Sequence, residues 1–346
     1  MVLPTRKIGN AQVAEIGFGA MGLAAFYGKV ESDEGRFKVL DAAYEAGCRH
    51  WDTAYIYGDS EDLIGKWFKR TGKRDDIFLA TKGGEAVSVG SDGAYVSAAD
   101  GSAEFIRSQV DTSLARLGVE HIDLYYIHRI DPRTPIEVTV GALKELVKEG
   151  KIRAIGLSEC SAKCLRRAHA VYPIAALQIE YSPFVLDIEF PEVGLLAACR
   201  ELGVTVVAYA PLGRGLLTGR YTSPEDFDAD DYRRVLPKFS KENFPKILDV
   251  VARLRKIGER HRASAAQVTL AWMLAQGQDI VLIPGTRSVK YLKENIGGSA
   301  VRLSADEVAA VRKIAEESQT SITGKRYPDE HMAGTFVDSL ELPIAP

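Results

Sequence analysis

Short apolar runs alternate with amphipathic segments along the chain. Eight of these runs are rich in β-branched residues and show little polar alternation, which is typical of strands buried on both faces of a parallel sheet. The predicted strands are residues 13–18, 48–53, 77–82, 123–128, 152–158, 175–181, 204–210 and 279–285. Strands that alternate with helices across short connections favour parallel pairing, and eight such units predict a (β/α)8 barrel. An open doubly wound sheet is the alternative, although it usually has fewer strands.

The segments between these strands carry helical spacing and helix-ending signals. Apolar residues recur at helical spacing in residues 37–47, 102–118 and 135–150. Ser102 and Ser161 are candidate N-caps. Glycine, the usual residue beyond a helix end, follows four of the predicted helices, at Gly47, Gly118, Gly150 and Gly203.

The remaining segments are a leading hairpin and three long stretches. Residues 3–16 predict a hairpin that turns at Gly9-Asn10 and plugs the N-terminal end of the barrel. Long loops at the C-terminal face of a barrel usually handle substrate or cofactor. The three long stretches are residues 84–101, 219–243 and 317–346. With no interdomain linker, residues 1–346 are expected to form a single barrel domain.

Composition narrows the function classes. The net charge is −3 and no basic block suggests nucleic-acid binding. The N-terminus lacks a signal pattern, and no apolar run approaches the roughly 18 residues that span a bilayer. The four cysteines, which show no zinc-like spacing to other ligands, are expected to stay reduced; they are Cys48, Cys160, Cys164 and Cys199. The expectation is a soluble cytoplasmic protein without a metal site or a membrane partner.

Four ionisable side chains occupy equivalent places in three successive β-α units. Asp52 and Tyr57 lie where one predicted strand runs into a helix, and Lys82 and His128 end the next two strands. In a parallel barrel the strand C-termini converge on one mouth, where catalytic groups collect. Each residue alone has a structural explanation, such as packing or a buried ion pair. Their coincidence at three consecutive strand ends favours an enzyme.

The four side chains suit the reduction of a carbonyl group, which needs a hydride from one side and a proton from the other. Tyr57 is the candidate acid, and the Lys82 ammonium is expected to lower the pKa of its phenol. Asp52 would keep a buried Lys82 charged. His128 can donate a hydrogen bond to the carbonyl oxygen, which polarises and orients it.

Two loops are candidates for seating a hydride donor. In residues 209–220, Tyr209 could stack on a nicotinamide ring, and the Gly-rich loop that follows could bind a pyrophosphate. In residues 283–288, Thr286, Arg287 and the start of the next helix form an anion site suited to a phosphate. Phosphate sites after strands seven and eight are habitual in this architecture. For either loop taken alone, the alternative is an ordinary turn between a strand and a helix.

The G-x-G-x-x-G stretch at residues 17–22 is not interpreted as a dinucleotide fingerprint. No helix is expected to open before Ser32–Asp33, and the acid that ends the second strand, Asp52, lies thirty residues beyond Gly22. The stretch predicts a turn at the barrel mouth. Its glycines, Gly19 among them, let the backbone approach a ligand.

At this point the chain resembles the aldo-keto reductase superfamily, over nearly its whole length. The motifs DTAYIYG, IDLYYIHR, GKIRAIGLSE, LQIEYSP, AYAPLGRGLLTG and IPGTRS occur in the family's order. The resemblance implies a (β/α)8 barrel that binds NADPH extended, with Asp52, Tyr57, Lys82 and His128 as catalytic tetrad. Together with the loops above it implies cofactor contacts from Gly19, Ser158, Gln178, Tyr209, Pro211, Leu212, Gly213, Arg214, Gly215, Leu217, Pro284, Gly285, Thr286, Arg287, Lys290, Glu294 and Asn295.

The chain departs from the family pattern at three positions. Many members have Asn where this chain has Glu159, and some have Lys and Arg where it has Gly285 and Tyr291. A preference for NADP would therefore depend on Arg287, with help from Lys290. The GLSE and PGTRS segments resemble the branch with aryl-aldehyde and pyridoxal reductases. Candidate substrate contacts, for which loop packing is the alternative, are Met21, Phe26, Tyr27, Tyr55 and Arg129.

The sequence thus favours an NADPH-dependent reductase of aldehydes or ketones, reversible with NADP⁺. Two alternatives stay open. One is a cofactor-bound regulatory subunit with little turnover, as some family members are. The other is a Schiff-base aldolase that uses Lys82, which would leave Asp52, Tyr57 and the phosphate loops without a purpose.

Overall fold

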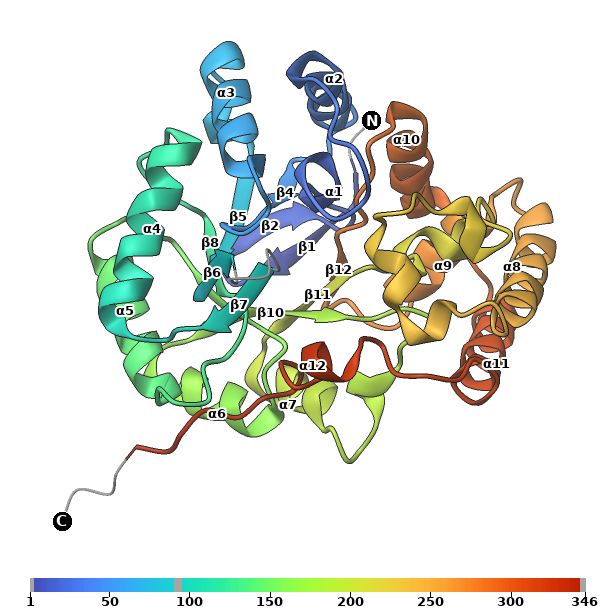
Figure 1. The fold of residues 1–346 in the computed structure, drawn as a ribbon. Helices are drawn as coiled ribbons and strands as arrows, with labels where there is room; N and C mark the ends of the chain where they lie inside the picture. The colour runs from blue at the N-terminus through green and yellow to red at the C-terminus, as the bar shows by residue number, and fades with distance from the viewer. Residues whose placement is uncertain (1–2, 90–94, 343–346) are drawn as a thin grey trace.

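The architecture is a closed barrel of parallel strands inside a ring of helices (Figure 1). The computed structural model describes residues 3–89 and 95–342. Eight strands pair in the order β12-β11-β10-β9-β8-β5-β4-β3. Backbone bonds close the remaining seam, since Gly17 N–H donates to the Leu282 carbonyl at 2.7 Å and Leu282 N–H donates to that of Glu15 at 2.9 Å. The predicted (β/α)8 barrel is confirmed.

Seven of the eight predicted strands match a barrel strand, and the first is wrong in part. The barrel strands are β3 (Phe18–Gly19), β4 (His50–Asp52), β5 (Phe78–Gly83), β8 (Leu124–Ile127), β9 (Ile155–Ser158), β10 (Ile174–Glu180), β11 (Thr205–Tyr209) and β12 (Ile280–Leu282). The run at residues 13–18 is divided between two ladders. Val13 and Ala14 pair antiparallel with Arg6 and Thr5, whereas Phe18 pairs with Trp51 in the barrel.

The helices surround the barrel in chain order. They are α1 (Met21–Ala24), α2 (Asp33–Glu45), α3 (Ser60–Thr71), α4 (Ala103–Leu117), α5 (Ile136–Lys148), α6 (Ala162–Val171), α7 (Leu195–Leu202), α8 (Phe244–Glu259), α9 (Ala265–Leu274), α10 (Val289–Gly297), α11 (Ala305–Ser321) and α12 (Asp329–Met332). Ser161 caps α6 by accepting the Cys164 N–H at 3.0 Å, whereas Ser102 precedes α4 without a side-chain bond. The expectation that no helix opens before Ser32 is wrong, because the four-residue helix α1 starts at Met21.

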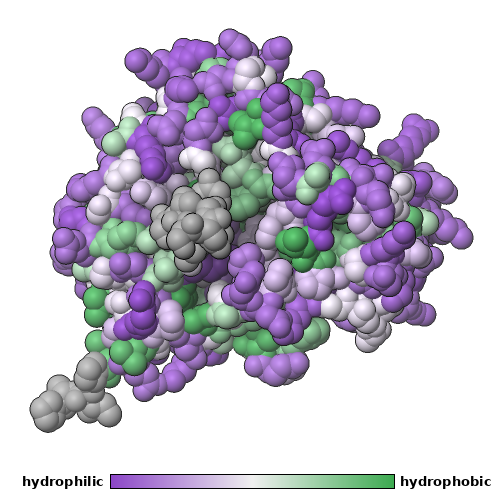
Figure 2. Space-filling view, in the orientation of Figure 1, coloured by the Kyte–Doolittle hydropathy of each residue, from purple (hydrophilic) through white to green (hydrophobic). Residues whose placement is uncertain are grey.

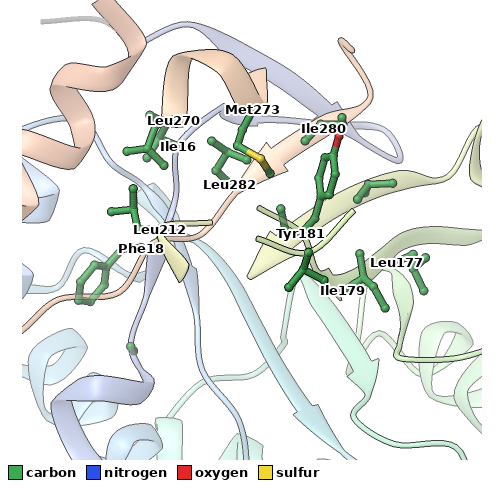
Figure 3. Packing of buried hydrophobic residues seen from close by; sticks show 14 of the residues in the cluster. Ile16, Phe18, Leu177, Ile179, Tyr181, Leu212, Leu270, Met273, Ile280 and Leu282 are labelled. Atoms are coloured by element: carbon green, nitrogen blue, oxygen red, sulfur yellow. The ribbon is translucent and has the colours of Figure 1, made fainter. Parts of the chain in front are cut away.

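The strands are buried on both faces, as their unbroken apolar runs predict. Inside the barrel the core holds Ala80, Leu124, Tyr126, Ala176, Val207 and Val281. Ile8 and Val13 from the leading hairpin, β1 (Thr5–Ile8) and β2 (Ala11–Ala14), belong to the same cluster. The hairpin therefore closes one end of the barrel. A second, larger cluster joins strand residues to residues of the surrounding helices, and part of it is shown in Figure 3.

The three long stretches have structure of their own. Residues 84–101 carry the antiparallel strands β6 (Glu85–Val89) and β7 (Tyr95–Ala99), and their connection at 90–94 lies outside the described residues. Residues 219–243 form short 3-10 turns. The third begins as the end of α11, and residues 322–340 then form a strap that carries α12 across one face of the barrel (Figure 1). None of the described helices is long and apolar enough to cross a membrane.

Candidate active site

Strand ends at the barrel mouth bring Asp52, Tyr57 and Lys82 into direct contact. Lys82 Nζ donates to Asp52 Oδ1 at 2.5 Å and to the Thr53 carbonyl at 2.7 Å. The same nitrogen lies 3.3 Å from Tyr57 Oη. Parallel pairing of β4 with β5 aligns Asp52 with Ala80, so that Lys82 extends past the end of β4 toward the loop that carries Tyr57. The ammonium is fully buried and bridges the carboxylate and the phenol.

His128 completes the group from the next barrel strand. It follows the end of β8 directly, and its ring packs edge-on against Tyr57 with 5.6 Å between the ring centroids. Gln178, on β10, reaches the same centre and donates from Nε2 to Asp52 Oδ2 at 2.7 Å. Asp52 is thus held by Lys82 on one oxygen and Gln178 on the other. All four predicted side chains therefore lie together at the barrel mouth.

Burial dominates the electrostatics of this group. It raises the pKa of Tyr57, and Lys82 opposes that rise only in part. The predicted influence of Lys82 therefore has the expected sign, but the net shift is upward. Burial likewise raises the pKa of Asp52 against the pull of Lys82. For Lys82 burial acts downward, but Asp52 and Tyr57 raise its pKa overall, so the lysine stays an ammonium.

A second buried network lies beside this centre, around Tyr209 and Glu159. Tyr209 Oη donates to Glu159 Oε1 at 2.7 Å and lies 2.8 Å from Tyr327 Oη. Arg326 binds the same carboxylate at 3.2 and 3.0 Å, with both side chains almost completely buried. Burial raises the pKa of Glu159, but the charges of Arg326 and Arg129 lower it overall. The position where the family often has Asn is therefore an ion pair in this chain.

The C-terminal strap supplies half of that network. Besides Arg326 and Tyr327, its backbone pairs with the end of β9, where Val337 N–H donates to the Glu159 carbonyl at 3.3 Å. Farther along, Ser339 Oγ accepts the N–H of Ile136 at the start of α5 at 2.9 Å. The strap thus crosses the mouth from α11 to α5. Figure 2 shows a hollow near the middle of this face, with hydrophilic side chains over most of the surrounding surface.

The predicted pyrophosphate loop follows β11 over Gly213–Thr218, and it is kinked, because Arg214 and Gly215 have non-helical φ and ψ. Gly213, Arg214 and Gly215 all have positive φ, which Gly213 and Gly215 adopt without steric cost. Pro211, Leu212 and Leu217 are buried beneath the turn. The Arg214 side chain turns to Glu180 Oε2 at 3.0 Å and Tyr327 Oη at 2.7 Å. Its charge is therefore engaged within the strap network.

The predicted phosphate site lies where the strand β12 leads into α10. Helix α10 has Ser288 at its N-cap, whose side chain makes no capping hydrogen bond, and the N-terminus of a helix attracts an anion. Thr286, half-buried Arg287 and exposed Lys290 surround that helix start. Beneath them Pro284 and Asn295 are buried and Glu294 is half-buried. This set of donors and cations fits a phosphate group.

Two glycines allow the barrel to close next to this site. Gly19 and Gly285 form a parallel bridge, and a Cβ on Gly19 would meet the Ile283 carbonyl at 2.7 Å. A Cβ on Gly285 would meet the Gly19 carbonyl at the same distance. Neither residue tolerates a side chain without shifting the seam. Ser158 lies buried at the end of β9, in register with Gln178 on β10.

The predicted substrate contacts differ in their exposure and in the side chains they pack against. Phe26 lies at the mouth, 46% exposed, with its ring 6.3 Å from that of Tyr57 and 6.4 Å from that of Tyr232. Met21 and Arg129 are half-buried. Tyr55 packs against the Arg116 guanidinium at 4.3 Å, and Tyr27 lies under that of Arg233 at 5.0 Å. Phe26 thus packs its ring against that of Tyr57.

Several residues of this region were missed from the sequence. Glu85 lies with Oε2 3.0 Å from His128 Nδ1. Tyr232 Oη lies 2.6 Å from His331 Nδ1, which brings the strap to the ring pair of Tyr232 and Phe26. Arg326 and Tyr327 lie in the predicted long stretch at residues 317–346, but nothing local in the sequence indicates their partners. The signal for Glu85 was its place two residues beyond Gly83, the last residue of β5.

Comparisons with known proteins agree with this geometry. Residues 15–316 match the aldo/keto reductase family. The chain is 63% identical over 348 residues to aldo-keto reductase str7 of Strobilurus tenacellus, covering 99% of this chain and 100% of that protein. It is 49% identical over 345 residues to aldo-keto reductase yakc [NADP(+)] of Schizosaccharomyces pombe, with coverage of 99% and 100%.

A solved structure gives the same result for the fold. Glycerol dehydrogenase AKR11B4 of Gluconobacter oxydans superimposes with a TM-score of 0.82 at 29% identity, covering 93% of this chain and 98% of that one. The strand ends bring an acid, a phenol, an ammonium and an imidazole together in one barrel mouth, and the sequence matches the family model and these relatives. The chain belongs to the aldo/keto reductase family.

Proposed function

We propose that this single barrel domain, residues 1–346, reduces aldehydes or ketones to alcohols with NADPH, and oxidises alcohols with NADP⁺ in reverse. The observation that carries the proposal is the Lys82 ammonium, 2.5 Å from Asp52 Oδ1 and 3.3 Å from Tyr57 Oη, beside the His128 ring. A buried phenol that contacts an ammonium can release a proton and be left as a stabilised phenolate.

In this proposal Tyr57 delivers the proton to the carbonyl oxygen. Its raised pKa keeps the phenol protonated before reaction. Lys82 stabilises the phenolate that remains, and Asp52 keeps Lys82 charged in a fully buried position. NADPH, when bound, supplies the hydride. His128, whose ring meets that of Tyr57, lies beside the same oxygen.

Different residues would hold the carboxamide, the pyrophosphate and the 2′-phosphate of the cofactor. Ser158 and Gln178 lie side by side on β9 and β10, where they would hold a carboxamide, and Tyr209 ends β11 in register with Glu180, two residues beyond Gln178. The loop at Gly213–Thr218 would bind the pyrophosphate. Arg287 and Lys290 at the start of α10 would bind a 2′-phosphate. The yakc relative is named for NADP(+), which agrees with this choice over NAD.

We further propose aromatic aldehydes as preferred substrates. Phe26 and Tyr232 meet edge-on beside Tyr57, and an aromatic ring in such a wall gains about 0.5–1.5 kcal/mol beyond area burial. The Lys82 ion pair with Asp52 argues against the Schiff-base alternative, since an amine held as an ammonium is not a nucleophile.

The first experiment follows NADPH and NADH oxidation across aromatic, aliphatic and pyridoxal-type aldehydes. Native protein should turn over with NADPH preferred. Tyr57→Phe should lose about 10²–10⁴-fold in turnover, the usual contribution of a positioned acid, and should keep NADPH binding. Tyr44→Phe, a surface tyrosine on α2 bonded to Asp76, is the matched control. Full activity in Tyr57→Phe would refute the assignment; saturable NADPH binding without any turnover would favour a regulatory subunit.

A further inference from the structure

Arg129 is a charged side chain at the barrel mouth without a carboxylate partner among the described residues. Its one hydrogen bond within them runs from Nη1 to the His128 carbonyl, at 2.9 Å. Other arginines near the mouth form buried ion pairs, which are Arg326 with Glu159, Arg214 with Glu180 and Arg233 with Asp231. A guanidinium has five N–H donors, so most of the Arg129 fork is left for a ligand or for water.

The neighbouring segments hold Arg129 beside the reaction centre. It directly follows His128, whose ring packs against that of Tyr57. The strap lies against its stem, since a Cβ on Gly334 would meet Arg129 Cδ at 3.7 Å and Nε at 3.9 Å. The side chain is half-buried, so part of it stays accessible. The backbone bond on one side and the strap on the other therefore limit its movement without covering it.

The charge of Arg129 acts on the phenols that surround the mouth. Burial raises the pKa of Tyr57, and Arg129 opposes that rise. Burial and Arg129 oppose each other in the same way at Tyr209, Tyr232 and Tyr327. These phenols come from the end of β11, from residues 219–243, from the strap and from the loop after β4. A charge that acts on all four lies near the centre of the mouth, where a substrate has to reach Tyr57.

The acids around Arg129 leave this charge available to a ligand. Burial would lower the pKa of Arg129, but Tyr209, Glu159 and Glu85 raise it overall, so the guanidinium stays charged. Both carboxylates accept closer bonds from other side chains. Arg326 donates to Glu159 Oε2 at 3.0 Å, and Ser97 donates to Glu85 Oε1 at 2.7 Å. Arg129 is thus a cation that the protein positions but does not pair.

We propose that Arg129 binds a carboxylate group of the substrate, so that the enzyme prefers aromatic aldehydes that carry an acid. A guanidinium fork matches the two oxygens of one carboxylate, and one cation balances its single charge. The aromatic ring of the substrate would pack against Phe26 and Tyr232, which meet edge-on beside Tyr57. The proposal rests on the proposed reductase function and deepens it by naming the substrate class.

The bond changes of the reduction are the same for such a substrate. The carbonyl carbon takes the hydride, its oxygen takes the Tyr57 proton, and the carboxylate keeps its charge. A contact that is equally strong in the aldehyde and in the transition state lowers KM without raising kcat. The contribution of Arg129 should therefore appear in KM, which makes it a specificity-determining residue.

The test compares the three positional isomers of carboxybenzaldehyde with the matching nitrobenzaldehydes. A nitro group has the planar shape of a carboxylate without its net charge, and the ratio of the two kcat/KM values removes any effect common to both. Arg129→Met keeps the stem and removes the charge. For at least one isomer the ratio should fall about ten- to a hundredfold through KM, the effect of a hydrogen bond to a charged group.

Two further variants separate charge from shape. Arg129→Lys keeps the charge without the fork and should recover part of the ratio. Arg133→Met is the matched control, because exposed Arg133 lies in the same loop and already pairs with Asp131 at 3.1 Å. It should leave the ratio as in native protein. A fall in Arg133→Met as large as that in Arg129→Met would overturn the proposal, since any nearby cation would then serve.

A binding measurement does not depend on turnover. Titration calorimetry compares each hydroxymethylbenzoate with the matching nitrobenzyl alcohol, with and without NADP⁺. Native protein should bind at least one of the carboxylates more tightly, and Arg129→Met should lose that preference. Native protein without such a preference overturns the proposal even if Arg129→Met fails to fold, and so does an unchanged kcat/KM ratio in the folded variant. If no carbonyl is turned over, the reductase function fails, while calorimetry still decides whether Arg129 binds a carboxylate.

Discussion

Replacement of Arg326 by Met isolates the strap's contribution to the barrel mouth. Met keeps the aliphatic stem and removes the guanidinium, which leaves the fully buried Glu159 carboxylate without its ion-pair partner. Breaking a buried pair usually costs about 3–5 kcal/mol. Tyr209 Oη and the Glu180 N–H still donate to Glu159, so the lower value of about 3 kcal/mol applies. For 346 residues that corresponds to a fall in Tm of about 4 °C.

The pH dependence of this loss follows from the Glu159 carboxyl. In native protein its pKa is lowered overall, so it contributes stability above the unfolded value of about 4.3 and loses it as the pH falls through the folded pKa. Without Arg326, burial raises the folded pKa, and the variant is destabilised wherever the unfolded chain is ionised. The Tm difference between native and variant should therefore be largest near pH 7 and shrink toward about pH 4.5.

The assay is calorimetric or fluorescence-detected unfolding of both proteins across this pH range, with NADPH binding measured at pH 7. Arg166→Met serves as control, because Arg166 pairs with Glu201 at the surface, where such a pair contributes about 0–1 kcal/mol. Because Glu159 also holds Tyr209, NADPH should bind more weakly to Arg326→Met. A Tm change no larger than that of Arg166→Met, or one that does not shrink at low pH, would refute the reasoning.

Two further substitutions probe the centre and the phosphate site. Lys82→Met should abolish turnover and cost about 3–5 kcal/mol in stability, because Asp52 stays buried with Gln178 as its remaining partner. Adding Asp52→Asn to this variant should restore the Tm without restoring turnover. If Lys82→Met is inactive but loses no stability, the buried pair is contradicted. Arg287→Ala should weaken NADPH binding by about 2 kcal/mol, roughly thirtyfold in Kd, and leave NADH unchanged, as titration by fluorescence would show. An equal loss for both cofactors would remove Arg287 from the 2′-phosphate site.

The parts of the site that the sequence predicts are those set by strand ends. Asp52, Lys82 and His128 each follow an apolar strand, and parallel strands bring such ends to one mouth. The position of these side chains thus follows from local pattern and topology alone. The same reasoning fails at residues 13–18, because a continuous apolar run does not reveal that its first half pairs antiparallel with the residues before it.

The parts that could not be predicted depend on contacts between distant segments. Arg326 and Glu159 are 167 residues apart in the chain, and no periodic pattern connects them. The net pKa shift of Tyr57 has the same origin, because depth of burial, which outweighs Lys82, is a property of the assembled barrel. Glu85 was missed because residues 84–101 read as a loop, whereas pairing in β6 and β7 places its carboxylate beside His128.

The order of the segments has a consequence for biosynthesis, because the strap follows the strands and outer helices of the barrel along the chain. Arg326 and Tyr327 are made after every strand and outer helix of the barrel, yet they neutralise Glu159 and tether Tyr209 and Arg214. A nascent chain can assemble its barrel and still carry an uncompensated carboxylate in its mouth. The strap therefore completes the barrel mouth last, and a shortened chain that ends at α11 would lack the side chains that neutralise Glu159 and bind Tyr209.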